Sequence, residues 1–154
     1  MKANTQDKLY VDIASLYGAG RVPFASGTFA CILALPFYIF IHSAVLFAVF
    51  TALVTILGFA VCTRAEKALG KKDHKYMVID DFAGQLVTFL FVPFDWRLFW
   101  AGFFLFRMLD MLKVFPANWM EKQNGSLGVV GDDIIAGIYA NIILLTAAHF
   151  IFKV

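Results

Sequence analysis

Long apolar runs fill most of this chain, and short polar stretches separate them. The clearest run covers residues 43–63, about the 20 residues that the hydrocarbon core of a bilayer requires. Four further runs cover residues 29–42, 81–92, 97–113 and 132–152. Pro36 interrupts the run at 29–42, which is therefore either a kinked span or a partly re-entrant one. The pattern predicts an all-α, polytopic membrane bundle of about five short spans, with residues 1–154 forming a single domain.

The N-terminal part of the chain has a different pattern. Leu9, Ile13 and Leu16 recur at helical spacing, with polar residues between them. Residues 7–17 are therefore predicted to form an amphipathic helix that lies in the membrane interface and does not cross it. A glycine-containing loop over residues 18–28 follows.

The composition is that of a membrane protein. The chain is 61% hydrophobic and 16% charged, whereas soluble domains average about 45–50% apolar and about 25% charged residues. Cys31 and Cys62 lie within apolar runs, without metal-binding or redox spacing. Both are expected to be buried small hydrophobic residues that form no disulfide.

Charged residues are distributed unevenly between the two sides of the predicted bundle. Of the 13 Lys and Arg residues, 11 fall on the side of the N-terminus, and only Arg97 and Lys153 fall on the other. Of the 11 acidic residues, only Asp95 falls on the far side. The positive-inside rule makes the N-terminal side cytoplasmic. Because every polar motif gathers at that face, the pattern indicates a site and not a pore.

Two pairs of adjacent carboxylates, Asp80-Asp81 and Asp132-Asp133, each follow an apolar approach and precede a long apolar run. An Asp at a helix start can cap the helix and complement its dipole, but one Asp per helix would serve that purpose. Adjacent like charges beside hydrocarbon are costly unless something compensates them. With Asp110, the pairs place up to five carboxylates at one membrane depth, an arrangement that suits a hard divalent cation such as Mg²⁺.

Small residues lie on the same predicted helical faces as these acids. Gly84 follows Asp81 by three positions, and Gly137 follows Asp133 by four. Small residues let membrane helices approach closely, so both faces are expected to pack, whether or not they also build a site.

Basic residues on the run at 97–113 are candidates for binding phosphate. Arg107, Asp110 and Lys113 step by three, which keeps them on one side of a helix. Ionisable residues in a span are functional candidates, with Arg binding phosphate as a planar fork and Lys as a point charge. The alternative is an Arg107–Asp110 pair that neutralises itself, with Lys113 extending to the interface.

Three other residues are further candidates for phosphate binding. Arg21 and Thr28 belong to the glycine-containing loop, which either offers backbone N–H donors at a helix start or is a turn capped by Thr28. His74 lies in a charged loop over residues 64–75 and is either an acid or ligand, or a surface histidine without a role.

The chain lacks the motifs of several phosphatase mechanisms. It has no Cys-x5-Arg loop, no Asp-x-Asp-x-Thr after a strand, and no Arg and His set of a histidine-nucleophile lipid phosphatase. Metal-assisted hydrolysis remains, in which a divalent cation polarises the phosphoryl group and a carboxylate orients water.

Four motifs follow one another along the chain. The first is a Gly-x-Gly…Pro…Gly-Thr loop at residues 18–28, and the second is an Asp-His stretch leading to an acidic pair and glycine at 73–84. The third is Phe-Arg-x-x-Asp-x-x-Lys at 106–113, and the fourth is Gly-x-x-x-Asp-Asp-x-x-Ala-Gly at 128–137. In this order, the motifs resemble the phosphatidylglycerophosphatase A family over nearly the whole chain.

The chain departs from the family pattern at three positions. Ser26 and Val114 stand where the family usually has Pro, and Asp81 stands where it usually has Glu. The change at Asp81 shortens a carboxylate side chain by one methylene, so the metal geometry of the family does not carry over unchanged.

The resemblance implies hydrolysis of phosphatidylglycerophosphate to phosphatidylglycerol and phosphate, with Mg²⁺ as the cofactor. The substrate would be a phospholipid in the cytoplasmic leaflet of a bacterial inner membrane that the protein crosses several times, and no nucleic-acid partner is expected. The predicted catalytic residues are Asp80, Asp81, Asp132 and Asp133, the predicted metal ligands are Asp81, Asp110, Asp132 and Asp133, and the predicted phosphate-binding residues are Arg107, Lys113, Arg21, Thr28 and His74.

Two other functions are alternatives. A CDP-alcohol-type lipid phosphotransferase also holds paired Asp residues in a membrane bundle, but its Asp-Gly-x2-Ala-Arg signature is absent here. A small cation transporter with a carboxylate ion site would carry charge near mid-membrane and on both sides, whereas this chain keeps its charge at one end.

Overall fold

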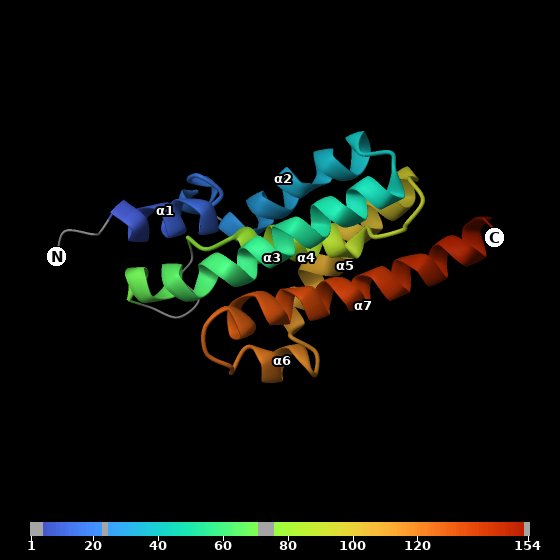
Figure 1. Cartoon of the computed structure of the whole chain (residues 1–154). Coiled ribbons are helices and arrows are strands. Elements are labelled where there is room, and N and C mark those ends of the chain that lie inside the picture. Colours follow the sequence, from blue (N-terminus) through green and yellow to red (C-terminus); the bar gives the residue numbers. More distant parts are fainter. Residues whose placement is uncertain (1–4, 23–24, 71–75, 153–154) are drawn as a thin grey trace.

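The computed structural model describes residues 5–22, 25–70 and 76–152, and every regular element within them is a helix (Figure 1). The all-α prediction is therefore confirmed. The elements are α1 (Thr5–Ala14), the 3-10 turn η1 (Ala19–Arg21), α2 (Ser26–Phe40), α3 (Ala44–Leu69), α4 (Ile79–Thr88), α5 (Trp96–Leu112), α6 (Ala117–Met120) and α7 (Ser126–Phe152).

Five of the helices lie along one another, and successive ones alternate in direction. Figure 1 shows α2, α3, α4, α5 and α7 in this arrangement, with α1 and α6 at the end where α4 and α7 begin. The first turns of α2, α4 and α7 and the last turns of α3 and α5 therefore gather at the same end. This end carries the predicted acidic and basic motifs.

The short helix α4 lies at the centre of the bundle. It packs against α2, α3, α5 and α7, and each of its residues except Asp81 is buried. Its 10 residues rise about 15 Å, half of the roughly 30 Å hydrocarbon core of a bilayer. The predicted span at 81–92 is therefore wrong in its length, because α4 begins at Ile79 and ends at Thr88 without reaching across.

Glycines set the distance between α4 and its neighbours. A side chain at Gly84 would come within 2.6 Å of the Phe106 ring and 2.8 Å of the Asp133 carbonyl oxygen. A side chain at Gly137 would come within 2.5 Å of the carbonyl oxygen of Gly84. The backbones of α4 and α7 are therefore in contact, and the predicted close packing of the two small-residue faces is confirmed.

Helix α7 begins earlier than the sequence predicts. The predicted span at 132–152 starts at the second acidic pair, but α7 starts at Ser126. Thr63 of α3 explains the difference, because the Ser126 N–H donates to Thr63 Oγ1 and the Thr63 N–H donates to Ser126 Oγ, each at 2.9 Å. A cap supplied by another helix leaves no local signature.

Two other predicted boundaries differ by a few residues from the structure. Helix α3 continues six residues past the predicted end at 63, so part of the predicted loop at 64–75 is helical. The predicted interfacial helix at 7–17 is shorter at its C-terminal end, and packs against α3. Cys31 and Cys62 are both buried and neither belongs to a disulfide, as expected.

Two of the helices within the described residues, α3 and α7, are long and apolar enough to cross a membrane. In each, 28% of the most apolar 18-residue window is buried, so most of that apolar surface faces outward. Helices α2 and α5 have 15 and 17 residues. The prediction of about five spans is not confirmed by helix length, although the outward apolar surface on α3 and α7 is typical of a chain placed in lipid.

The glycine contacts generate a stability prediction. Gly84→Ala is expected to lower the free energy of unfolding by about 1–3 kcal/mol, because the added methyl group overpacks the contact of α4 with Phe106 and α7. Thermal unfolding of the purified protein in detergent measures the change. Gly58→Ala is the matched control, since its methyl group would lie 3.6 Å from its nearest neighbour, Val130. Equal losses in both variants would contradict the proposed packing.

Candidate functional site

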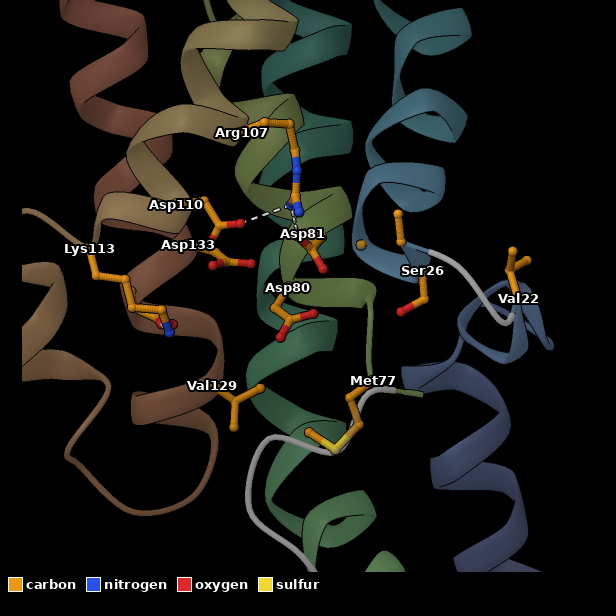
Figure 2. Close-up of a pocket in the computed structure, with 13 residues that line it drawn as sticks. Val22, Ser26, Met77, Asp80, Asp81, Arg107, Asp110, Lys113, Val129 and Asp133 are labelled. Atoms are coloured by element: carbon orange, nitrogen blue, oxygen red, sulfur yellow. Dashed lines mark hydrogen bonds and ion pairs between the residues drawn. The ribbon is translucent and has the colours of Figure 1, made fainter.

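A cavity of about 460 Å³ opens where the first turns of α2, α4 and α7 meet the last turns of α5 (Figure 2). All five predicted carboxylates and both predicted cations of α5 line it. The lining residues are Val22, Ala25, Ser26, Gly27, Met77, Asp80, Asp81, Arg107, Asp110, Lys113, Val129, Asp132 and Asp133.

The first acidic pair occupies the first turn of α4, as predicted. The Val78 N–H donates to the carbonyl oxygen of Ala14 at 2.9 Å, which attaches the residue before α4 to the end of α1. Asp80 is buried, whereas Asp81 lies against the N-terminal turn of α2. A side chain at Gly27 would collide with the Asp81 carboxylate, so the glycine of the Gly-Thr motif leaves room for this acid.

The second acidic pair lies within α7 and not at its start. Asp132 and Asp133 are buried, and α7 packs against both α4 and α5. Adjacent residues on a helix point about 100° apart. Asp132 therefore reaches Lys113 at the end of α5, while Asp133 reaches the acidic pair of α4.

Three carboxylates from two helices converge in the cavity. Asp80, Asp81 and Asp133 each offer an oxygen atom, and these atoms lie within 4.8 Å of one another. Such crowding of like charges is unfavourable unless a cation lies among them. Carboxylate oxygens are ligands that suit Mg²⁺, so these three residues could hold such an ion.

Arg107 joins three helices on one flank of the cavity. Its Nη1 donates to Asp110 Oδ2 at 2.8 Å within α5, and it also pairs with Asp81 of α4. The same atom lies 3.9 Å from the Cys31 sulfur of α2. The self-neutralising Arg107–Asp110 pair is therefore present, but Arg107 also compensates a carboxylate of the converging group (Figure 2).

Lys113 compensates carboxylates on the other flank of the cavity. It follows α5 with left-handed backbone geometry, and its Nζ lies 3.0 Å from Asp132 Oδ2 and 2.7 Å from Glu121 Oε1. Two carboxylates therefore compensate the charge of this partly buried ammonium group. Lys113 is therefore a stable cation at the cavity wall.

Of the predicted phosphate-binding residues, two described ones are not brought to the cavity wall, and a third is not among the described residues. Arg21 pairs with Asp12 at 3.2 Å, with its side chain 60% exposed, and does not line the cavity. Thr28 is partly buried within α2 and does not line it either. His74 lies outside the described residues.

The structure also adds residues that the sequence did not single out for the site. Ser26 lines the cavity at the start of α2, while Met77 and Val129 form its apolar margin. Glu121 pairs with Lys113 from the end of α6. Glu121 has no local signature, because its role depends on the position of α6 beside Lys113. Val129 lies on α7, one turn before the second acidic pair.

The cavity has an excess of acidic side chains. It is lined by five Asp side chains and by the cations Arg107 and Lys113. Fully ionised, the lining therefore has three more negative than positive charges. A divalent cation would offset most of that excess, and a phosphate could then approach the two cationic flanks.

Comparison with known proteins agrees with this chemistry. The family model described as phosphatidylglycerophosphatase A matches residues 13–148. A protein of Escherichia coli (strain K12) named phosphatidylglycerophosphatase A is 33% identical over 137 residues, which cover 86% of this chain and 80% of the relative. A protein of the same name from Haemophilus influenzae is 31% identical over 139 residues, covering 87% of this chain and 85% of the relative.

A third relative has a different name. The Bacteroides thetaiotaomicron protein called "Putative phosphatidylinositol-3-phosphatase" is 32% identical over 149 residues, which cover 90% of this chain and 93% of the relative. No solved structure matches the chain.

The pairing of Arg107 generates a prediction about stability. Arg107→Met is expected to lower the free energy of unfolding by about 3–5 kcal/mol in metal-free buffer, because it leaves two largely buried carboxylates without their cation. Asp81→Asn in the same chain should restore part of the loss, since it removes one uncompensated charge. Chemical unfolding in detergent measures both variants. Arg97→Met is the control, because Arg97 and its partner Asp95 form an exposed pair, and an equal loss there would contradict the prediction.

Proposed function

This chain belongs to the phosphatidylglycerophosphatase A family, and we propose that it hydrolyses phosphatidylglycerophosphate to phosphatidylglycerol and phosphate in a Mg²⁺-dependent reaction. Its membership makes it a phosphoric monoester hydrolase that acts on a lipid. The observation that carries the proposal is the convergence of Asp80, Asp81 and Asp133 in one cavity with Arg107 and Lys113 on its flanks.

The carboxylates supply the binding site for the cation. Asp80, Asp81 and Asp133 fit Mg²⁺ because their oxygens are hard donors already gathered within 4.8 Å. When bound, Mg²⁺ supplies charge that polarises the phosphoryl group and lowers the pKa of a coordinated water. Asp110 and Asp132 were also predicted as ligands, but the oxygens gathered within 4.8 Å come from Asp80, Asp81 and Asp133, so we assign Asp110 and Asp132 to the margin of the metal site.

The cations of α5 bind the phosphate. Arg107 donates hydrogen bonds to Asp81, Asp110 and the Cys31 sulfur. Among the described residues, all three are donated by Nη1. Its Nε and Nη2 groups therefore remain for two oxygens of a phosphomonoester. Lys113 faces the same cavity as a point charge.

Asp132 is suited to orient the attacking water. Its Oδ2 lies 3.0 Å from Lys113 Nζ at the cavity wall, where a carboxylate can accept a hydrogen bond from water and take its proton. Asp80 is the other candidate for this role, because it is buried in the same cavity beside Asp81. The proton removed from water would pass to this carboxylate and from there to the oxygen of the leaving lipid, so that the P–O bond to the lipid breaks and the products are the lipid alcohol and inorganic phosphate.

The proposed setting is the inner membrane of a bacterium, with the cavity on the cytoplasmic side. Exposed apolar side chains along α3, α5 and α7, including Ile56, Phe104 and Ile142, support several membrane crossings. The excess of Lys and Arg at the cavity end supports its cytoplasmic orientation. The headgroup would then enter from the cytoplasmic leaflet while the acyl chains stay in lipid.

The two alternative functions, a cation transporter and a lipid phosphotransferase, would require features that differ from those of this cavity and sequence. A cation path needs polar groups through the bundle, whereas the carboxylates of this cavity gather at the end where α4 begins. A phosphotransferase would need a nucleotide-linked lipid, and its signature is absent from the chain. The name of the Bacteroides relative adds a phosphoinositide headgroup to the substrates that deserve comparison.

Release of phosphate from a panel of lipids tests the proposal. Purified protein is expected to release inorganic phosphate from phosphatidylglycerophosphate, without a nucleotide, and to release less from phosphatidate and phosphatidylinositol 3-phosphate. A chelator should abolish the activity, and added Mg²⁺ should restore it, because the acidic group loses its compensating charge. Turnover that continues in chelator would refute the role of the metal, and preference for another lipid would refute the substrate.

Substitutions in the acidic group test the assigned residues. Asp81→Asn and Asp133→Asn are each expected to lower kcat/KM at least about 100-fold, because each removes a charge from the proposed ligand set. Thermal unfolding should show both variants folded. Asp95→Asn, at the opposite end of the bundle, is the matched control and should remain close to wild type. Near-normal turnover in both site variants would refute the assignment.

A further inference from the structure

An exposed apolar stretch lies beside the cavity and has no part in the chemistry proposed above. Residues 111–119, called here the apolar segment, comprise the last two residues of α5, the connection at 113–116 and the first three residues of α6. Their exposed large apolar side chains are Met111, Leu112, Val114, Phe115 and Trp119. Phe115 is 71% exposed and Trp119 is 55% exposed, although both are large aromatic residues that soluble surfaces rarely leave together in one patch.

The backbone of the apolar segment is held against α7. The Tyr139 hydroxyl donates to the carbonyl oxygen of Phe115 at 2.9 Å. Lys113 reaches Asp132 at 3.0 Å, and the Met120 side chain fills the space that a side chain at Gly131 would need. The segment and α6 therefore lie alongside residues 131–139 of α7, as Figure 1 shows for α6.

This attachment fixes the level of the apolar segment along the bundle. Residues 131–139 include both acids of α7, so the exposed aromatic side chains lie at the level of the cavity. Helix α7 begins seven residues before Asp133, which is about 10 Å farther toward its N-terminal end. A membrane that covers Phe115 and Trp119 would therefore reach the level of the carboxylates, while the start of α7 would remain outside its apolar core.

We propose that the apolar segment is embedded in the membrane interface and holds the cavity at the level of the lipid phosphates. This inference rests on the proposed function for the nature of the substrate. A lipid surface fits the segment because Trp and Phe favour the interface, and because exposed apolar residues of α5, such as Phe104 and Met108, continue the same surface toward the bilayer. Lys113 lies within the segment and directs its cation to the cavity, where a headgroup phosphate would be drawn.

Fluorescence of Trp119 tests the placement without any use of activity. The chain has three tryptophans, so Trp96→Phe with Trp100→Phe leaves Trp119 as the single emitter. The variant is reconstituted in phosphatidylcholine vesicles whose acyl chains are brominated either near the headgroup or near the chain end. Strong quenching by bromine near the headgroup, with weak quenching by aqueous acrylamide, is the expected result.

Other quenching patterns overturn the proposal. Strong quenching by acrylamide alone would place the segment in water, and strongest quenching by bromine near the chain end would place it in the bilayer centre. Protection from both quenchers would indicate a protein contact, such as a second copy of the chain. Because quenching does not depend on turnover, a failure of the proposed function would leave this result readable.

Kinetics provide the functional arm of the test. Phe115→Ser with Trp119→Ser is expected to lower kcat/KM for long-chain lipid phosphate in vesicles about tenfold more than for a water-soluble short-chain analogue. Phe150→Ser is the matched control, because Phe150 is 76% exposed but lies near the end of α7 far from the cavity. An equal effect on both substrates, or an equal effect of the control, would overturn the proposal.

Discussion

The contact between the backbones of α4 and α7 is the constraint on which the site depends. Gly84 and Gly137 bring the two helices so close that a methyl group at either position would meet a carbonyl oxygen. This contact draws Asp133 of one helix toward Asp80 and Asp81 of the other. A pair of helices separated by ordinary side chains would lie about 8–10 Å apart, and their carboxylates could not share one small ligand as readily.

Such crowding of acids requires compensation, and the rest of the site supplies it. Arg107 bridges α5 to α4, and Lys113 bridges α5 to α7, so each acidic pair has one cationic partner. These ion pairs cover only part of the negative charge of the cavity. A fold that gathers excess carboxylate charge beside cations with donors left over is well suited to hold a divalent cation and a phosphate together. In this protein, the packing of the bundle and the chemistry proposed for it therefore depend on the same contacts.

Much of this arrangement could be predicted from the sequence, because the residues of each site motif follow helical spacing within their own helix. The all-α class and the joint location of both acidic pairs with Arg107 and Lys113 follow from apolar runs and from charge placement. The features that escaped prediction depend on contacts between distant segments. The early start of α7 requires Thr63 from another helix, and at the end of α4 the Asn141 amide of α7 donates to the carbonyl oxygens of Thr88 and Leu90. Arg21 likewise finds an acidic partner, Asp12, outside the predicted site.

The central claim is that the acids joined by the contact of α4 with α7 hold a divalent cation. Anomalous scattering from crystals of the protein grown with Mn²⁺ in place of Mg²⁺ tests it most directly, because it locates the ion without any assumption about the reaction. The account predicts an anomalous peak among the carboxylates of Asp80, Asp81 and Asp133, with Arg107 and Lys113 on either side. An ordered Mn²⁺ ion elsewhere, with these three carboxylates contacting only protein cations, would contradict it.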